Sequence, residues 1–133
     1  MTTDEIRAFI QQAIGENHVM LFMKGTPEQP MCGFSARTAA ALNTLGVEYS
    51  ALDLLPDPRI RQELSGLSQW PTIPQLFVDG NLVGGADIVT EMYDTGELAD
   101  TLGVAQPAGE QVPEPPAEES PHTAPLGLEN RLG

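Results

Sequence analysis

The feature that most constrains the fold is a short, uninterrupted apolar segment that runs from Val19 to Met23. Gly25 and Pro27 follow and end it. A run of this length without polar alternation is typical of a strand buried on both faces. Such a strand needs helices over each face of its sheet, so the chain predicts an α/β fold built around this segment.

Helix-like and strand-like segments alternate along the first 104 residues. The predicted helices are Thr3 to Gly15, 36–45 before Gly46, a helix from Asp57-Pro58 through Leu67, 88–93, and a helical stretch 97–102. The predicted strands are 19–23, 47–52, 75–78 and 82–83. Asp79-Gly80 is typical of a hairpin turn between antiparallel strands, whereas strand–helix–strand units make parallel pairs. These rules predict a four-stranded mixed sheet with helices on both faces.

The only cysteine of the chain, Cys32, lies between the central strand and the next helix. Free N–H groups and the positive end of the helix dipole favour a thiolate at such a position. Cys32 is therefore expected to be more nucleophilic than an average cysteine, with a small buried core thiol as the alternative. One cysteine cannot build a disulfide framework, which favours a reducing compartment and predicts a cytoplasmic protein.

The charge balance of the chain excludes several partners. The formal net charge is −13 and the sequence pI is near 4.2, which opposes binding to nucleic acid and to anionic membranes. The N-terminal segment carries three charged residues, Asp4, Glu5 and Arg7, before any long apolar run. No signal peptide is therefore expected. The apolar runs are too short to span a bilayer. Lys24 is the only lysine, which makes it a candidate for a specific role.

The composition changes after residue 104 and predicts a domain boundary there. Residues 105–133 hold six of the twelve prolines, several glutamates and no aromatic residue. A segment of this kind buries too little apolar surface to offset the entropy of the chain, so we expect a disordered acidic tail. A linker or solubilising extension is the simpler interpretation, and a binding role is the alternative.

Four motifs occur in order along the first 104 residues. They are Met23-Lys24-Gly25, Cys32-Gly33-Phe34-Ser35, Trp70-Pro71-Thr72-Ile73-Pro74-Gln75 with the following Leu76-Phe77-Val78-Asp79-Gly80, and Gly84-Gly85-Ala86-Asp87. Their combination resembles the monothiol glutaredoxins of the single-domain bacterial type. The resemblance covers about residues 3 to 104 and implies a thioredoxin-like fold, glutathione binding, and a 2Fe-2S cluster assembled between two protomers.

The resemblance makes Cys32 both the catalytic residue and the metal ligand. Ser35 stands where a dithiol oxidoreductase carries its second cysteine, and a hydroxyl cannot close a disulfide. Oxidised Cys32 therefore needs an external thiol such as glutathione. A 2Fe-2S cluster needs four soft ligands, which the family supplies as two Cys32 thiolates and two glutathione thiolates. This implies a homodimer, or a heterodimer with a BolA-like protein.

The resemblance also assigns the glutathione site. It places Lys24 and Arg61 at the glycyl carboxylate, although an exposed helix charge is the simple alternative for Arg61. It places Thr72, Ile73 and Pro74 in a loop with a cis proline, which leaves the backbone of the preceding residue free to pair with the cysteinyl part of glutathione.

The last motif completes this predicted site. Gly85, with Gly84 before it, allows close approach of the backbone to a ligand. Asp87 is by default the N-cap of the last helix, and the same end offers N–H groups to the γ-glutamyl carboxylate and an anion to its ammonium. Ala86 replaces the cysteine or serine of some family members, so no second thiol faces Cys32, although the backbone N–H of Ala86 can still bind ligand.

Two functions remain open at this level. The favoured one is a module that carries a labile 2Fe-2S cluster and passes it to apo iron-sulfur proteins. The alternative is an enzyme, a glutathione-dependent oxidoreductase that removes glutathione from mixed disulfides. A scaffold role of the acidic tail is a third and simpler possibility.

Overall fold

The computed structural model describes residues 1–105, and the predicted tail lies almost entirely outside them. The helices are α1 (Thr3–Glu16), α2 (Gly33–Leu45), α3 (Pro58–Ser68), α4 (Ala86–Thr95) and α5 (Glu97–Leu102). The strands are β1 (Val19–Met23), β2 (Ser50–Asp53), β3 (Gln75–Val78) and β4 (Asn81–Gly84). None of the described helices combines the length and the apolar character needed to cross a bilayer.

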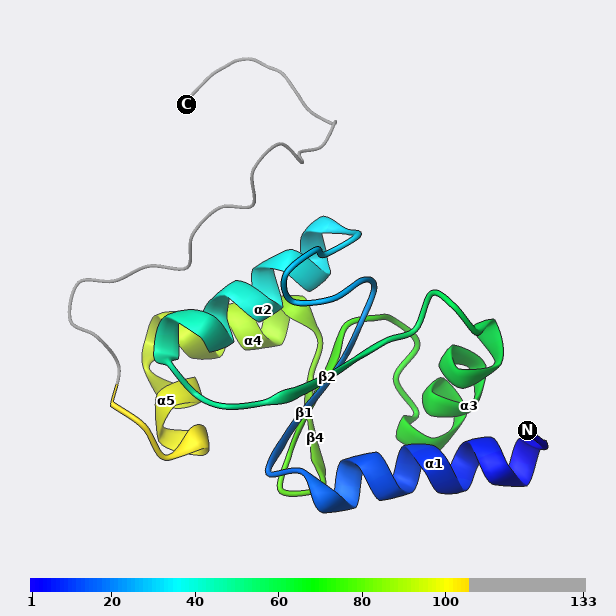
Figure 1. Ribbon diagram of the computed structural model, residues 1–133. Helices are drawn as coiled ribbons and strands as arrows, with labels where there is room; N and C mark the ends of the chain where they lie inside the picture. The colour runs from blue at the N-terminus through cyan, green and yellow to red at the C-terminus, as the bar shows by residue number, and fades with distance from the viewer. Residues whose placement is uncertain (106–133) are drawn as a thin grey trace, which may run out of the picture.

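The four strands form one mixed sheet in the order β2-β1-β3-β4 (Figure 1). β1 pairs in parallel with β2 and antiparallel with β3, and β3 and β4 form the hairpin. Asp79 and Gly80 have φ values of 52° and 82°, as a two-residue turn with both central residues in the left-handed region requires. The predicted mixed sheet and its hairpin are confirmed.

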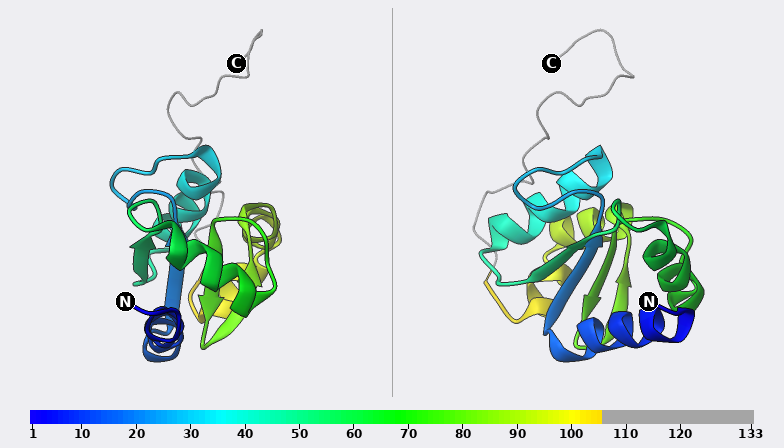
Figure 2. Two further views of the ribbon diagram at one scale, coloured as in Figure 1. Left: turned by 90° about the vertical axis from the view of Figure 1, so that its right-hand side faces the viewer. Right: turned by 45° about the vertical axis from the view of Figure 1, so that its right-hand side comes forward.

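The central strand is buried along its whole length, as the apolar run predicts. Val19, Leu21 and Met23 join a core cluster with residues of α2, α4 and α5. Met20 and Phe22 point to the other face and join a cluster with residues of α1 and α3. Figures 1 and 2 show these two helix layers on opposite sides of the sheet. Each layer therefore covers one face of β1.

Capping residues explain where several helices begin. Thr2 and Glu5 form a reciprocal capping box at the start of α1. Asp57 caps α3 through a hydrogen bond from the Arg59 N–H, and Pro58 follows at the first helical position, as predicted. Gly46 ends α2 with a φ of 71°, in the left-handed region.

Several predicted boundaries differ from the structure, most of all the starts of α2 and β2. α2 begins at Gly33 rather than at residue 36, because Cys32 itself is its N-cap. β2 begins at Ser50 rather than at residue 47. Val47 and Tyr49 pack against the cluster under α2, so the apolar alternation that suggested an earlier start reflects contact with a helix rather than strand pairing.

We expect Leu64→Ala to lower the free energy of unfolding by about 2–5 kcal/mol, because truncation leaves a cavity in the cluster beneath α1 and α3. Leu64 is 0% exposed and packs in that cluster. Leu55→Ala is the matched control, since Leu55 is 49% exposed and its truncation should cost less than about 0.5 kcal/mol. Urea unfolding followed by circular dichroism measures both. Equal losses for the two variants would contradict this description of the core.

His18 and Asp79 tie the start of β1 to the hairpin turn. The His18 Nδ1 and Asp79 Oδ1 atoms lie 2.5 Å apart, and the Asp79 N–H donates to the His18 carbonyl at 2.8 Å. The hydrogen bond to the Asp79 carboxylate, followed by its negative charge, raises the pKa of His18 above 6.5. The pair therefore stabilises the fold fully below the unfolded pKa of His18, and this contribution is lost as pH rises through the raised folded pKa.

We predict that Asp79→Asn lowers the pKa of His18, because the amide cannot stabilise an imidazolium as a carboxylate does. Asparagine tolerates the positive φ of position 79, so the turn should survive. An NMR titration of the His18 ring protons in both proteins gives the two pKa values. An unchanged titration midpoint would show that the pair does not form in solution.

Candidate functional site

Cys32 occupies the N-cap position of α2 and is partly exposed. Its Sγ atom accepts a hydrogen bond from the Ser35 N–H at 3.4 Å, and its carbonyl accepts from the Ala36 N–H at 3.0 Å. The sulfur thus takes the place that a serine or aspartate oxygen usually fills at a helix start. The prediction that Cys32 begins this helix is confirmed, and a fully buried core thiol is not what the structure shows.

Ser35 connects the thiol to the end of the central strand. It is fully buried, and its Oγ accepts a hydrogen bond from the Lys24 N–H at 3.0 Å. The Cys32 Sγ lies 3.4 Å from the same oxygen. At this distance the thiol can donate to the Ser35 oxygen while the Ser35 N–H donates to the sulfur. Ser35 therefore positions the sulfur, although its hydroxyl cannot form a disulfide.

The loop that leads to Cys32 depends on Gly25. Its φ is 87°, and a Cβ atom there would lie 2.5 Å from the Gln29 carbonyl oxygen. The Gly25 N–H donates to the Asp53 Oδ1 at 2.9 Å, which fixes the loop to the end of β2. The Met31 N–H donates a hydrogen bond to the Lys24 carbonyl at 2.9 Å. The loop is thus closed at both ends beside β1, and Cys32 follows directly.

A groove of about 330 Å³ lies next to this helix start. It contains all eight residues that the sequence predicted for ligand binding: Lys24, Arg61, Thr72, Ile73, Pro74, Gly85, Ala86 and Asp87. Phe34, Trp70 and Ile88 complete its lining. Cys32 is not a lining residue, but Phe34, two positions further along α2, is one. The structure therefore brings the predicted residues together, while their roles remain predictions.

The loop before β3 forms one wall of this groove. The Ile73–Pro74 peptide bond is cis, as the resemblance implied. Gln75 is fully buried, and its Nε2 donates to the Trp70 carbonyl at 3.0 Å and to the Thr72 carbonyl at 3.2 Å. These bonds hold the loop against the sheet. The sequence analysis missed this positioning role of Gln75, although a polar residue at the start of a buried strand was a usable signal.

Gly85 lines the groove on the side of α4, and Gly84 precedes it at the end of β4. A Cβ atom at Gly85 would lie 3.2 Å from the Trp70 Nε1 and 3.3 Å from the Pro74 carbonyl oxygen. At Gly84, where φ is 147°, it would lie 2.8 Å from the Ile88 Cδ1. The two walls therefore approach closely only because position 85 carries no side chain.

The prediction that Asp87 caps the last helix is wrong. The N-cap of α4 is Gly85, which has no side chain, and Asp87 is the second residue of the helix. The side chain of Asp87 is thus not used as the cap. The backbone N–H groups of the first turn of α4 lie at the groove. Lys24, which follows β1, and Arg61 of α3 add positive charge, so the groove has groups for ligands of both signs.

The described residues contain no group of three or more histidine, cysteine, aspartate or glutamate side chains that could hold a metal ion. Within residues 1–105, Cys32 is a free cysteine and belongs to no such group. Any cluster bound here would need ligands from outside the subunit.

Comparison with known proteins agrees with this geometry. The family model described as Glutaredoxin matches residues 19–83. A probable monothiol glutaredoxin 2 of Rickettsia prowazekii is 52% identical over 102 residues, which cover 77% of this chain and 95% of that protein. Glutaredoxin 4 of Escherichia coli K12 is 54% identical over 89 residues, which cover 67% of this chain and 77% of that protein.

Solved structures show the same fold. Reduced apo GrxS14 of poplar superposes with a TM-score of 0.69 at 36% identity, covering 77% of this chain and 95% of that one. A monomeric truncated mutant of Trypanosoma brucei 1-C-Grx1 gives a TM-score of 0.66 at 40% identity, covering 80% and 96%. With this thioredoxin-like fold, its lone thiol at the start of α2 and these relatives, the chain belongs to the glutaredoxin family and is a monothiol glutaredoxin.

Proposed function

We propose that this protein binds glutathione in the groove beside Cys32 and that two subunits together carry a 2Fe-2S cluster to apo iron-sulfur proteins. The observation that carries the proposal is a single, partly exposed thiol next to a groove with both positive and negative groups. The cluster is the cargo of this function. Both the thiol and its tripeptide partner need reducing conditions, which fit the cytoplasm.

The groove suits glutathione in size and charge. Its volume of about 330 Å³ falls at the lower end of the range for small-molecule sites. Lys24 and Arg61 can bind the glycyl carboxylate, since paired cations recognise carboxylates well. The first-turn N–H groups of α4 suit the γ-glutamyl carboxylate, and Asp87 suits the neighbouring ammonium. The backbone of Ile73 remains the candidate partner of the cysteinyl part.

The number of ligands supports a shared cluster. A 2Fe-2S cluster takes four soft ligands, and each subunit has one cysteine. Two Cys32 thiolates and two bound glutathiones would complete the set. Met31 and Phe34, which flank Cys32, are 63% and 57% exposed and give the second subunit an apolar surface to contact. The second subunit would be another copy or a BolA-like protein.

Thiol-disulfide exchange is the alternative activity of the same site. A mixed disulfide at Cys32 would be released by a second glutathione, because Ser35 cannot act as the resolving thiol. Ala86 likewise offers a methyl group where a second sulfur could stand. These two features favour cluster binding over disulfide chemistry.

We predict that anaerobic reconstitution with iron, sulfide and glutathione gives a coloured dimer and that Cys32→Ser stays colourless and monomeric. The variant removes the one thiolate that each subunit offers to iron. Visible absorption and size-exclusion chromatography measure the two properties, with omission of glutathione as the control. A colourless wild-type monomer that reduces glutathione mixed disulfides rapidly would instead establish the oxidoreductase.

We predict that Gly85→Ala weakens glutathione binding about tenfold, because the new methyl group pushes Trp70 or the Pro74 carbonyl into the groove. Gly66→Ala is the matched control, since a Cβ at that position would meet no described atom within 4 Å beyond its chain neighbours and the backbone of its own helix. Calorimetric titration of both variants with reduced glutathione gives the affinities. Equal affinities would show that glutathione binds elsewhere.

A further inference from the structure

β2 is one of the two outer strands of the sheet, and one of its backbone edges has no strand partner among residues 1–105. The Leu54 N–H donates to the Met23 carbonyl at 2.9 Å, so the backbone N–H of Leu54 points toward β1. Because N–H groups alternate in direction along a strand, those of Ala51 and Asp53 point away from β1. An open strand edge of this kind can pair with an added strand.

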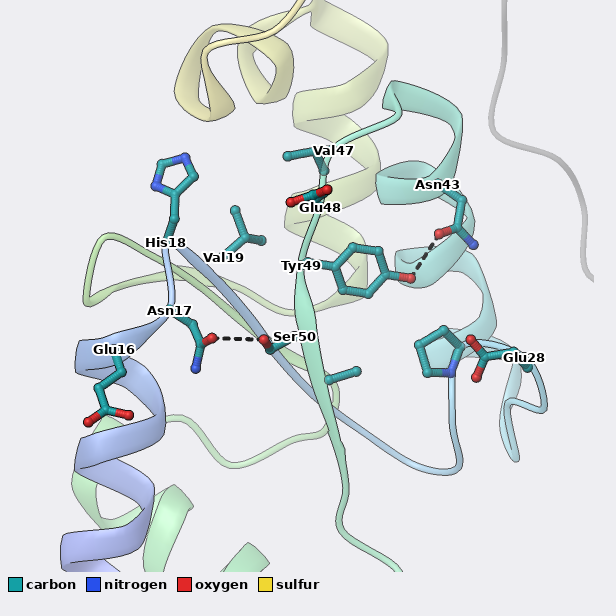
Figure 3. A pocket seen from close by; sticks show the side chains of 12 residues that line it. Glu16, Asn17, His18, Val19, Glu28, Asn43, Val47, Glu48, Tyr49 and Ser50 are labelled. Carbon is teal, nitrogen blue, oxygen red and sulfur yellow. Dashed lines mark hydrogen bonds between the residues drawn. The ribbon is translucent and has the colours of Figure 1, made fainter.

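A hollow of about 990 Å³ is lined by Ser50 and Ala51 at the start of this strand and by residues that precede it, and it shares no lining residue with the groove beside Cys32. Figure 3 shows β2 running through its middle, with Glu16 and Asn17 on one side and Asn43 and Glu28 on the other. The Ser50 hydroxyl donates to the Asn17 Oδ1 at 2.8 Å, which ties β2 to the end of α1.

The opposite side of the hollow is also fixed. The Tyr49 hydroxyl donates to the Asn43 Oδ1 at 2.9 Å, which ties the start of β2 to α2 (Figure 3). The aromatic ring of Tyr49 and the side chain of Val47 add apolar surface to the lining. The strand edge is therefore held open between two helices rather than covered by either.

The rim of this hollow is acidic. The rim carries three exposed carboxylates, Glu16, Glu28 and Glu48. None of the twelve described lining residues is a lysine or an arginine, and the one histidine among them, His18, is paired with Asp79. Burial raises the pKa of Tyr49, and the negative charge of Glu28 raises it further. The negative field of the rim thus reaches the side chains beside the strand.

We propose that this hollow binds an extended, lysine- or arginine-rich segment of a partner protein, which adds to the free edge of β2 as a further strand. Backbone hydrogen bonds to the outward-facing groups of Ala51 and Asp53 would hold the segment, and Glu16, Glu28 and Glu48 would attract its cations. A second copy of this chain is a poor occupant, because its own three carboxylates would repel those of the first copy. The chain's own residues 106–133 carry five glutamates and one arginine, so their charge also has the wrong sign.

The test uses the full-length protein and the synthetic peptide acetyl-Lys-Val-Lys-Val-Lys-Val-amide as the probe. We expect the peptide to shift the backbone amide signals of Ala51 and Asp53 in two-dimensional ¹⁵N NMR spectra and to slow their hydrogen exchange. The double variant Glu28→Gln/Glu48→Gln should bind it roughly three- to tenfold more weakly, because two charge pairs are lost. The matched control Glu91→Gln/Asp94→Asn removes two exposed charges from α4 and should bind as the wild type does.

Two further peptides separate strand addition from simple charge attraction. A peptide with glutamate in place of lysine should not bind, and one with proline in place of the central valine should lose the protection of Ala51 while keeping its charge. Equal binding of the proline peptide, or signal changes confined to the groove of Lys24 and Arg61, would overturn the proposal. So would an Ala51 amide that is already protected in the free protein, since a second copy or the chain's own tail would then cover the edge.

Discussion

The burial of β1 on both faces is the constraint on which the rest of the structure depends. Its side chains alternate between the cluster under α2, α4 and α5 and the cluster under α1 and α3. Neither helix layer could be removed without exposing half of the strand. The strand is followed by Lys24, whose N–H donates to the Ser35 hydroxyl oxygen next to the Cys32 sulfur. The core and the thiol are therefore linked through one buried hydroxyl group.

The topology of the sheet explains why residues far apart in sequence line one groove. β1 and β3 are antiparallel, with Phe22 opposite Gln75, so the residue that follows β1 and the loop that precedes β3 meet at one edge. β4 is antiparallel to β3, and its end at Gly84 returns the chain to the same edge, where α4 begins. Binding groups gather where strand ends meet, as in many α/β proteins.

Short sequence patterns were sufficient to predict most helices and strands of the fold. An unbroken apolar run identified the central strand, Asp79-Gly80 identified the hairpin, and Asp57-Pro58 identified the start of α3, because each depends on neighbouring residues alone. The resemblance supplied the residues of the groove. What could not be predicted depends on distant contacts: the buried hydrogen bonds of Gln75, the fit of Gly85 against Trp70, and the open edge of β2 between two helices.

The groove also joins the two helix layers. Arg61 belongs to α3, which packs on one face of the sheet, whereas Gly85 and Asp87 belong to the start of α4, which packs on the other. Any molecule that contacts both sides is a bridge between layers that otherwise meet through the sheet. Binding of such a molecule would therefore stabilise the folded protein by joining both layers at once.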